Sequence, residues 1–138
     1  MDPSLEDYRV IAQLRATLRS FSRRSERIAR EEGLTPRQYL LLLMIKGADD
    51  GMQRSTVTEL AQRLQLTQST VTELVRRAED AGLVEREPSA DDARVTWLRL
   101  TDEGDKRLAR VVARNGPERR RLRELLAELD PDEVNQGV

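Results

Sequence analysis

Residues 56–82 read TVTELAQRLQLTQSTVTELVRRAEDAG and carry the start and stop signals of two helices. Thr56 and Glu59 have the spacing of a capping box, in which each side chain bonds the backbone N–H of the other residue at a helix start. After a tight connection, Thr67 is a second N-cap, and Gly82 closes the helix that follows because glycine tolerates the left-handed conformation. The stretch therefore predicts two helices joined by a short turn.

Two short strands follow this helix pair. Residues 83–86 and 95–100 have the composition of strands, while the segment 87–94 between them contains Pro88 and two aspartates. This pattern predicts a hairpin with a polar tip. A helix-turn-helix unit followed by such a hairpin is a winged helix-turn-helix, so we expect a mainly α fold with a small β-hairpin wing.

Longer helices flank the unit on both sides. Residues 5–32 place apolar side chains at the spacings of a coiled-coil seam, and the leucines of 122–129 form a second apolar stripe. An ordinary surface helix would carry the same arginine-rich outer faces, but the seam favours contact with a partner. Gly116–Pro117 interrupts the last helix, where proline forces a kink or a break. The seam residues of the first helix are Ile11, Leu14, Leu18, Phe21 and Ile28.

Thr35, Pro36 and Gln38 mark the start of another helix, with a threonine cap, proline at the first helical position and glutamine three residues after the cap. The residues that follow, 39–45, are apolar nearly all round, which predicts a helix buried on most sides.

The composition excludes several classes of protein. The chain has 138 residues, of which 38% are hydrophobic and 36% charged, which fits one domain spanning 1–138. It contains neither cysteine nor histidine, so it lacks disulfides, the usual transition-metal sites and histidine-based triads. It also has no glycine-rich phosphate loop or nucleophile elbow, no apolar run long enough to span a membrane and no signal-peptide pattern. We expect a cytoplasmic protein that is not an enzyme, with no cofactor, no metal and no membrane partner.

The second helix of the unit, residues 68–81, has an apolar face and a polar face. Val71, Leu74, Val75, Ala78 and Ala81 fall on one side at about 100° per residue and are expected in the core. The opposite side fits the major groove of DNA, which admits one helix. The DNA-binding candidates on this helix are Gln68, Ser69, Thr70, Thr72, Glu73, Arg76 and Arg77.

These candidates suit different contacts with a duplex. Arg76 can donate two hydrogen bonds to guanine, and the hydroxyls of Ser69, Thr70 and Thr72 can reach phosphates or bases. Glu73 either accepts from a cytosine amino group or orients Arg76 three residues away. A solvated face on an amphipathic helix would look the same in isolation, and it is the wing that favours DNA.

Charge does not by itself point to nucleic acid. The 24 basic and 25 acidic residues nearly cancel, and residues 53–100 contain seven arginines and eight acids. Phosphate contacts must therefore come from a few arginines, which predicts modest affinity with steep salt dependence. Besides Arg76 and Arg77, the candidates are Arg54, Arg63 and Arg94.

Several short motifs lie along the chain in a characteristic order and spacing. They are Leu34-Thr35 with Gln38, then 56–64, 69–72, Gly82-Leu83-Val84, Asp92-Ala93-Arg94, Leu100-Thr101 and Gly104. Together, over residues 5–133, they resemble the MarR family of bacterial transcriptional regulators. The resemblance implies a sequence-specific DNA-binding regulator, commonly a repressor, that acts as a homodimer.

The resemblance also divides the chain into functional parts. It implies a DNA-binding lobe over 35–100 and dimerisation helices over 5–32 and 101–134. It implies that Arg94 at the wing enters the minor groove, held by Asp92, although an exposed hairpin ion pair would have the same sequence. The chain departs from the family pattern at Gln65, where the family often has glycine, at the Gly116–Pro117 interruption, and in a short terminal helix.

Members of the family commonly release DNA when a small molecule settles between the dimer helices and the DNA-binding lobe. The resemblance places such an effector pocket at Tyr8, Leu14, Arg15, Tyr39, Leu43 and Val111, although packing in the core would explain every one of these residues and is the favoured interpretation. The alternative function is that of a winged-helix protein–protein interaction module without DNA binding, which the weakly acidic balance of 53–100 fits.

Overall fold

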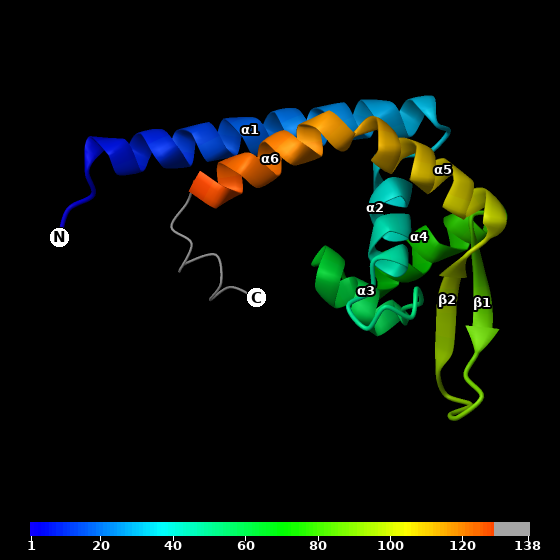
Figure 1. Cartoon of the computed structure of the whole chain (residues 1–138). Coiled ribbons are helices and arrows are strands. Elements are labelled where there is room, and N and C mark those ends of the chain that lie inside the picture. The colour runs from blue at the N-terminus through cyan, green and yellow to red at the C-terminus, as the bar shows by residue number, and fades with distance from the viewer. Residues whose placement is uncertain (129–138) are drawn as a thin grey trace.

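A computed structural model of the chain describes residues 1–128. Figure 1 shows α1 and α6 running side by side as a long arm, with α2, α3, α4 and the hairpin hanging from one end of it. The elements are α1 (Leu5–Glu31), α2 (Pro36–Lys46), α3 (Val57–Leu64), α4 (Gln68–Asp80), β1 (Val84–Pro88), β2 (Thr96–Leu100), α5 (Asp102–Arg114) and α6 (Gly116–Glu128). The predicted mainly α fold with a hairpin wing is confirmed.

The helix starts lie where their caps predict them. The Oγ1 of Thr35 accepts from the backbone N–H of Gln38 at 3.1 Å, and that of Thr56 accepts from the N–H of Glu59 at 3.2 Å. In both cases the third residue also accepts from the N–H of the cap, which completes the capping box. Each reciprocal pair satisfies two N–H groups that a helix start would leave without partners, and so fixes where α2 and α3 begin.

The lobe formed by α2, α3, α4 and the hairpin has a continuous apolar core. As predicted, α2 is buried on most sides, although its Leu40 is exposed. Several of the core side chains have no exposed surface, so each contributes its full burial to stability. They include Leu41, Leu42, Ile45, Leu60, Val71, Val75, Leu83 and Leu98.

The wing is a two-stranded antiparallel hairpin in which Val84 pairs with Leu100 and Pro88 with Thr96. Pro88 was expected in the tip but ends β1 instead. Proline is tolerated there because it lies at the end of a strand at the edge of the sheet. Ser55 extends the hairpin on the other side, since its backbone exchanges hydrogen bonds with Leu98 at 3.1 and 2.8 Å.

Gly104 fixes how α5 meets the wing. A Cβ at this position would lie 2.2 Å from the carbonyl oxygen of Leu83, so only glycine fits this close approach. Thr101 strengthens the same junction, because its Oγ1 donates to the carbonyl of Gly82 at 2.6 Å and its N–H donates to the carbonyl of Leu83.

The arm differs from the lobe because much of its apolar seam is uncovered. Ile28 is buried against the lobe, whereas Ile11 is 55% exposed and Leu18 is 39% exposed. As predicted, the last helix is interrupted: α5 ends at Arg114 and α6 begins at Gly116. Leu129 and the end of the predicted helix, 129–134, lie outside the described residues.

Within residues 1–128, no helix is both long enough and apolar enough to cross a membrane. The same part of the chain has no group of three or more acidic side chains placed to hold a metal ion.

Candidate nucleic-acid interface

The helix α4 anchors one face in the core and leaves the other in solvent. Val71, Val75 and Ala78 are fully buried, and Leu74 is half-buried. Ala81, which was expected in the core, is exposed because the helix has ended at Asp80 and Ala81 is its C-cap. The four anchors fix the rotation of α4 about its own axis, and so determine which side chains face outwards.

The N-terminal turn of α4 carries most of the neutral polar candidates. Ser69 and Thr72 are exposed, and Thr70 is half-buried. The Oγ1 of Thr67 donates to the Oγ1 of Thr70 at 2.8 Å, and the amide of Gln68 donates to Thr58 on α3 at 3.4 Å. The hydroxyl of Thr67 also shares a hydrogen bond with that of Ser69 at 3.2 Å. Thr70 and Ser69 are thus tied to the N-cap and Gln68 to α3, while Thr72 has its side chain in solvent.

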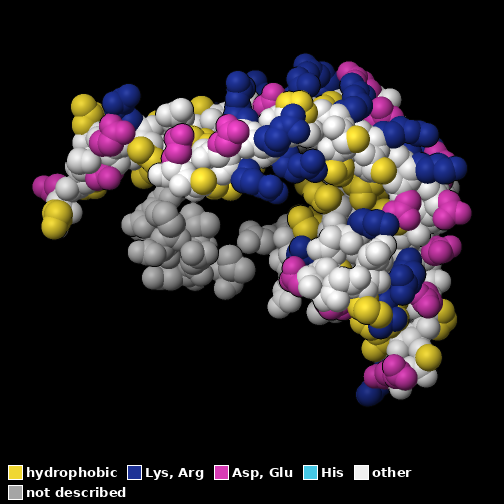
Figure 2. Space-filling model, in the orientation of Figure 1, with side chains coloured by type: hydrophobic (Ala, Val, Ile, Leu, Met, Phe, Trp, Pro, Cys, Tyr) yellow, Lys and Arg dark blue, Asp and Glu magenta, His cyan; other side chains and the backbone are white. Residues whose placement is uncertain are grey.

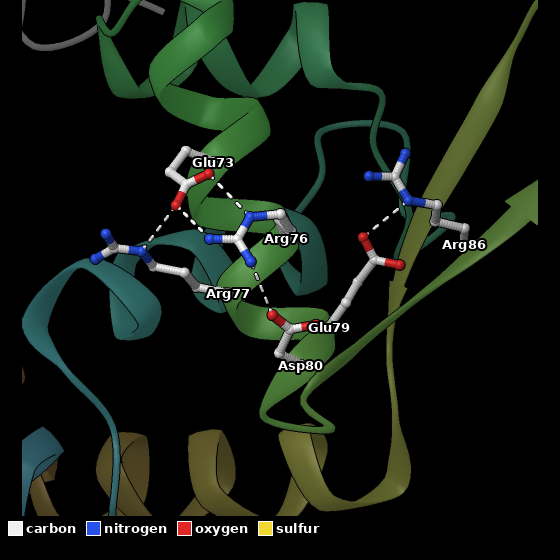
Figure 3. A network of polar contacts seen from close by, with 6 residues as sticks. All are labelled: Glu73, Arg76, Arg77, Glu79, Asp80 and Arg86. Carbon is white, nitrogen blue, oxygen red and sulfur yellow. Dashed lines mark hydrogen bonds and ion pairs between the residues drawn. The ribbon is translucent and has the colours of Figure 1, made fainter.

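The middle of the exposed face is occupied by charged side chains. Glu73 accepts from Arg76 through both carboxylate oxygens, at 2.6 Å from Nη2 and 3.0 Å from Nε, and also from Arg77 Nε at 3.1 Å (Figure 3). Arg76 donates in addition to Asp80 at 3.0 Å. The hydrogen bonds from Arg76 and Arg77 lower the pKa of Glu73 to about 2, so the carboxylate is ionised at neutral pH.

The wing connects to α4 and presents an arginine near its tip. Arg86 on β1 donates to Glu79 of α4 at 2.8 Å, which couples the strand to the helix. Arg94 lies in the turn with 90% of its side chain exposed. Asp92 accepts from the backbone N–H of Arg94 at 3.0 Å and from the guanidinium at 3.2 and 3.3 Å. The guanidinium bonds, more than the backbone bond, lower the pKa of Asp92.

Two arginines predicted to contact phosphate already have partners within the lobe. The guanidinium of Arg54 lies over the ring of Trp97, 4.1 Å from its centre. Arg63 donates to the carbonyls of Met44 and Gly47, at 3.0 and 3.4 Å, and so ties α3 to the end of α2. Their role at phosphates stays a prediction, because these contacts do not test it.

Sequence reasoning missed Arg37. This residue lies at the start of α2, is exposed, and lines a hollow together with Ser69, Thr70 and Arg77 at the start of α4. The packing of α2 against α4 places Arg37 and Arg77 on the same hollow, although 40 positions separate them in the sequence. No local pattern around Arg37 could have indicated this pairing.

The six residues of the predicted effector pocket do not gather in one place. Tyr39 and Leu43 line a hollow between α1 and α2 together with Phe21 and Ser25. Val111 is fully buried in the core. The remaining three, Tyr8, Leu14 and Arg15, belong to the outer half of α1 and do not line this hollow.

The sequence model of the MarR family matches residues 32–95, the segment that contains α2, α3, α4 and most of the wing. The HTH-type transcriptional repressor MdtR of Bacillus subtilis is 36% identical over 83 residues, which are 60% of this chain and 51% of the repressor. The lobe is therefore similar to that of MarR-family transcriptional regulators. The chain spans about half the length of that curated relative.

Solved MarR-family structures share the whole fold. A MarR-family protein from Bacillus stearothermophilus is 28% identical, with a TM-score of 0.64 over 92% of this chain and 86% of the other. Sco3205 from Streptomyces coelicolor, a MarR-family regulator solved in complex with DNA, is 24% identical and has a TM-score of 0.66 over 99% of this chain and 83% of its own. These likenesses extend over the arm as well as the lobe.

Proposed function

We propose that this chain is a sequence-specific DNA-binding transcriptional regulator of the MarR family and that it acts as a homodimer. Regulators of this family are commonly repressors, and we propose the same role here. The observation that carries the proposal is α4, anchored by a buried apolar face and followed directly by a wing with Arg94 near its tip. Residues 35–100 form the DNA-binding lobe. A protein with this function works where bacterial DNA lies, in the cytoplasm, and needs no enzymatic activity.

In the proposed complex, α4 lies in the major groove and the wing reaches the neighbouring minor groove. Ser69, Thr72 and Arg76 face the bases or the adjoining phosphates, while Arg37 and Arg77 flank a phosphate at the hollow beside the start of α4. Arg94, oriented by Asp92, enters the minor groove, whose negative potential attracts a guanidinium.

The arm supports the homodimer. A helix that leaves Ile11 and Leu18 in solvent buries them when it packs on a second copy, and exposed apolar patches of this kind mark interfaces. The dimerisation helices in this proposal are 5–32 and 101–134. The dimer of the double variant Ile11→Asp, Leu18→Asp should dissociate at concentrations roughly 100-fold higher than the wild-type dimer does. The reason is that two apolar side chains buried by dimerisation are lost. Sedimentation equilibrium measures this change, and an unchanged association constant would remove the arm from the interface.

The hollow beside Tyr39 and Leu43 supports a response to a small molecule. Ser25 lines this hollow, and its Oγ is buried without a hydrogen-bond partner among the described residues. Burial also raises the pKa of Tyr39, so its hydroxyl stays neutral and able to donate. A ligand that supplies partners here and prefers a splayed dimer would weaken DNA binding by shifting the population of dimer shapes.

Selection of bound duplexes from a random pool tests the proposal. We expect a two-fold symmetric site with half-sites about one helical turn apart. Affinity for that site should fall steeply with salt, and Arg94→Ala should weaken binding to all sequences alike while reducing the salt slope by about one per chain. No enrichment of any duplex, even in dilute buffer, would contradict DNA binding.

A winged-helix module that binds proteins is the second candidate. The observation in its favour is that the arginines of the lobe are largely matched by carboxylates, as in the pairs Arg76–Glu73, Arg86–Glu79 and Arg99–Glu87. The salt series decides between the two functions, because only phosphate contacts give the steep dependence of counterion release.

A further inference from the structure

The centre of the exposed face of α4 holds an ion-paired unit formed by Glu73 and Arg76. At about 100° per residue, these two residues point almost directly away from the buried Val71, Val75 and Ala78. Arg76 uses Nε and Nη2 on the two oxygens of Glu73, and Nη1 on Asp80, so three of its nitrogens are held (Figure 3). The unit presents donors and acceptors side by side at the surface that would meet a duplex.

A carboxylate in this place works against general affinity for DNA. It is ionised at neutral pH, it lies among the side chains that would approach the phosphates, and it holds both Arg76 and Arg77. A duplex that offers Glu73 no donor removes water from an ionised carboxylate and leaves it with its two arginines alone, close to the phosphates, which is costly. Binding is therefore more favourable where a base supplies a further hydrogen bond to the carboxylate.

One base pair supplies partners for the whole unit. In the major groove, guanine presents two acceptors, N7 and O6, and its paired cytosine presents one donor, the N4 amino group. A guanidinium beside a carboxylate matches this set, with arginine donating to guanine and glutamate accepting from cytosine. In an A·T pair, adenine has only one acceptor on this edge, so the two-bond contact of the arginine is lost.

We infer that Glu73 and Arg76 act together to read one G·C pair in each half-site, and that Glu73 is the residue that makes binding selective. This inference rests on the proposed function, since it assigns the base pair that the same helix recognises. Glu79, six residues further on, is engaged by Arg86 of the wing and has no part in the reading.

The test compares two glutamates on the same helix. Glu73→Gln and Glu79→Gln each remove one negative charge from α4 next to an arginine, and circular dichroism checks that both variants fold. Duplexes are selected from a random pool with wild type and with each variant. Affinities are then measured for the selected site, for the site with its G·C pair replaced by A·T, and for an unrelated duplex.

Wild type and Glu79→Gln should select a G·C pair at one position of each half-site. Replacing that pair should weaken their binding between about fivefold and a hundredfold, the range of one base-reading contact. Glu73→Gln should lose most of this discrimination, tolerate A·T there because an amide reads adenine, and bind the unrelated duplex more tightly than wild type does.

Two results overturn the inference and leave DNA binding standing. One is a selected site with no G·C pair under α4, and the other is a Glu73→Gln protein that discriminates as wild type does. A wild-type protein that enriches no duplex contradicts the proposed function itself, so the two failures are distinguishable.

Discussion

The pentapeptide TVTEL occurs twice in the chain, at residues 56–60 and 70–74, and the two copies do different work. In the first copy, Thr56 is the N-cap of α3 and Glu59 bonds back to it. In the second copy the cap is Thr67, so Thr70 already lies inside α4 and Glu73 bonds forward to Arg76 and Arg77.

The surroundings of the two copies differ as much as their local bonds. Leu60 of the first copy is fully buried, whereas Leu74 of the second is half-buried and lines a hollow of the proposed interface. Figure 2 shows the lobe and the hairpin with positive and negative side chains interspersed, and more Lys and Arg side chains gathered along the arm formed by α1 and α6. The distance of a residue from its helix cap, together with the packing of the helix, therefore determines whether the same five residues stabilise the fold or face solvent at the proposed interface.

The largest expected difference is between the two leucines. Leu60→Ala should lower the free energy of unfolding by about 2–5 kcal/mol, because it leaves a cavity in the core. Leu74→Ala should cost about 1 kcal/mol, since part of that side chain is already in water. Urea unfolding followed by circular dichroism measures both. Equal losses would mean that α4 packs as deeply as α3 at these positions.

The two threonines should differ next. Thr56→Ala removes the N-cap of α3 and should cost about 1 kcal/mol of stability. Thr70→Ala should leave stability almost unchanged, because alanine favours the interior of a helix and the cap Thr67 stays in place. Thermal unfolding of the two variants compares them. A loss at position 70 as large as that at position 56 would contradict the assignment of Thr67 as the cap.

The arginines four residues after each glutamate, Arg63 and Arg77, should also differ in their effects. Arg63→Ala should lower stability by about 1 kcal/mol, because it removes the donor that binds two carbonyls at the end of α2. Arg77→Ala should leave stability unchanged but weaken DNA binding severalfold and reduce the salt slope by about one per chain. Unfolding and salt-dependent mobility shifts separate the effects. The reverse assignment, with DNA binding lost at Arg63 only, would place the interface on α3.

The smallest effect concerns pH. The chain has no histidine, so its stability should be nearly constant between about pH 6 and 8. The pKa of Glu73 is about 2 in the folded protein against an ordinary 4.5. The stabilisation that Glu73 contributes is therefore complete above pH 4.5 and is lost as the pH falls towards 2. Glu73→Gln should lose less stability than wild type over that range, and identical acid unfolding curves would contradict the pairing.

Most of the fold could be predicted from the sequence because the helix ends depend on hydrogen bonds between residues that are close in sequence. The caps Thr35, Thr56 and Thr67 and the break at Gly116 need only neighbouring residues, and all four are confirmed. The pairing of Asp92 with Arg94 is equally local, and the structure contains it.

What sequence could not supply depends on packing between distant segments. Arg37 reaches the start of α4 only through the α2–α4 contact, and Arg54 finds Trp97 only across the wing. The effector pocket was predicted from the resemblance to the MarR family, and it grouped residues of α1, α2 and α5. The structure leaves Tyr8 exposed on the outer half of α1 and buries Val111 in the core. The predicted positions of Ala81 and Pro88 were wrong because each residue lies at the end of an element: Ala81 follows the last residue of α4, and Pro88 is the last residue of β1. Such boundaries are the hardest part of an element to predict.

In the proposed complex, two joined copies of the chain present α4 and the wing to one duplex with a fixed separation. The most direct test inserts about five base pairs, half a helical turn, between the half-sites of a selected duplex and measures affinity by mobility shift. Because the second lobe would then face the wrong side of the duplex, affinity should fall by at least about 100-fold, the advantage of simultaneous engagement. An affinity unchanged by the insertion would contradict this arrangement.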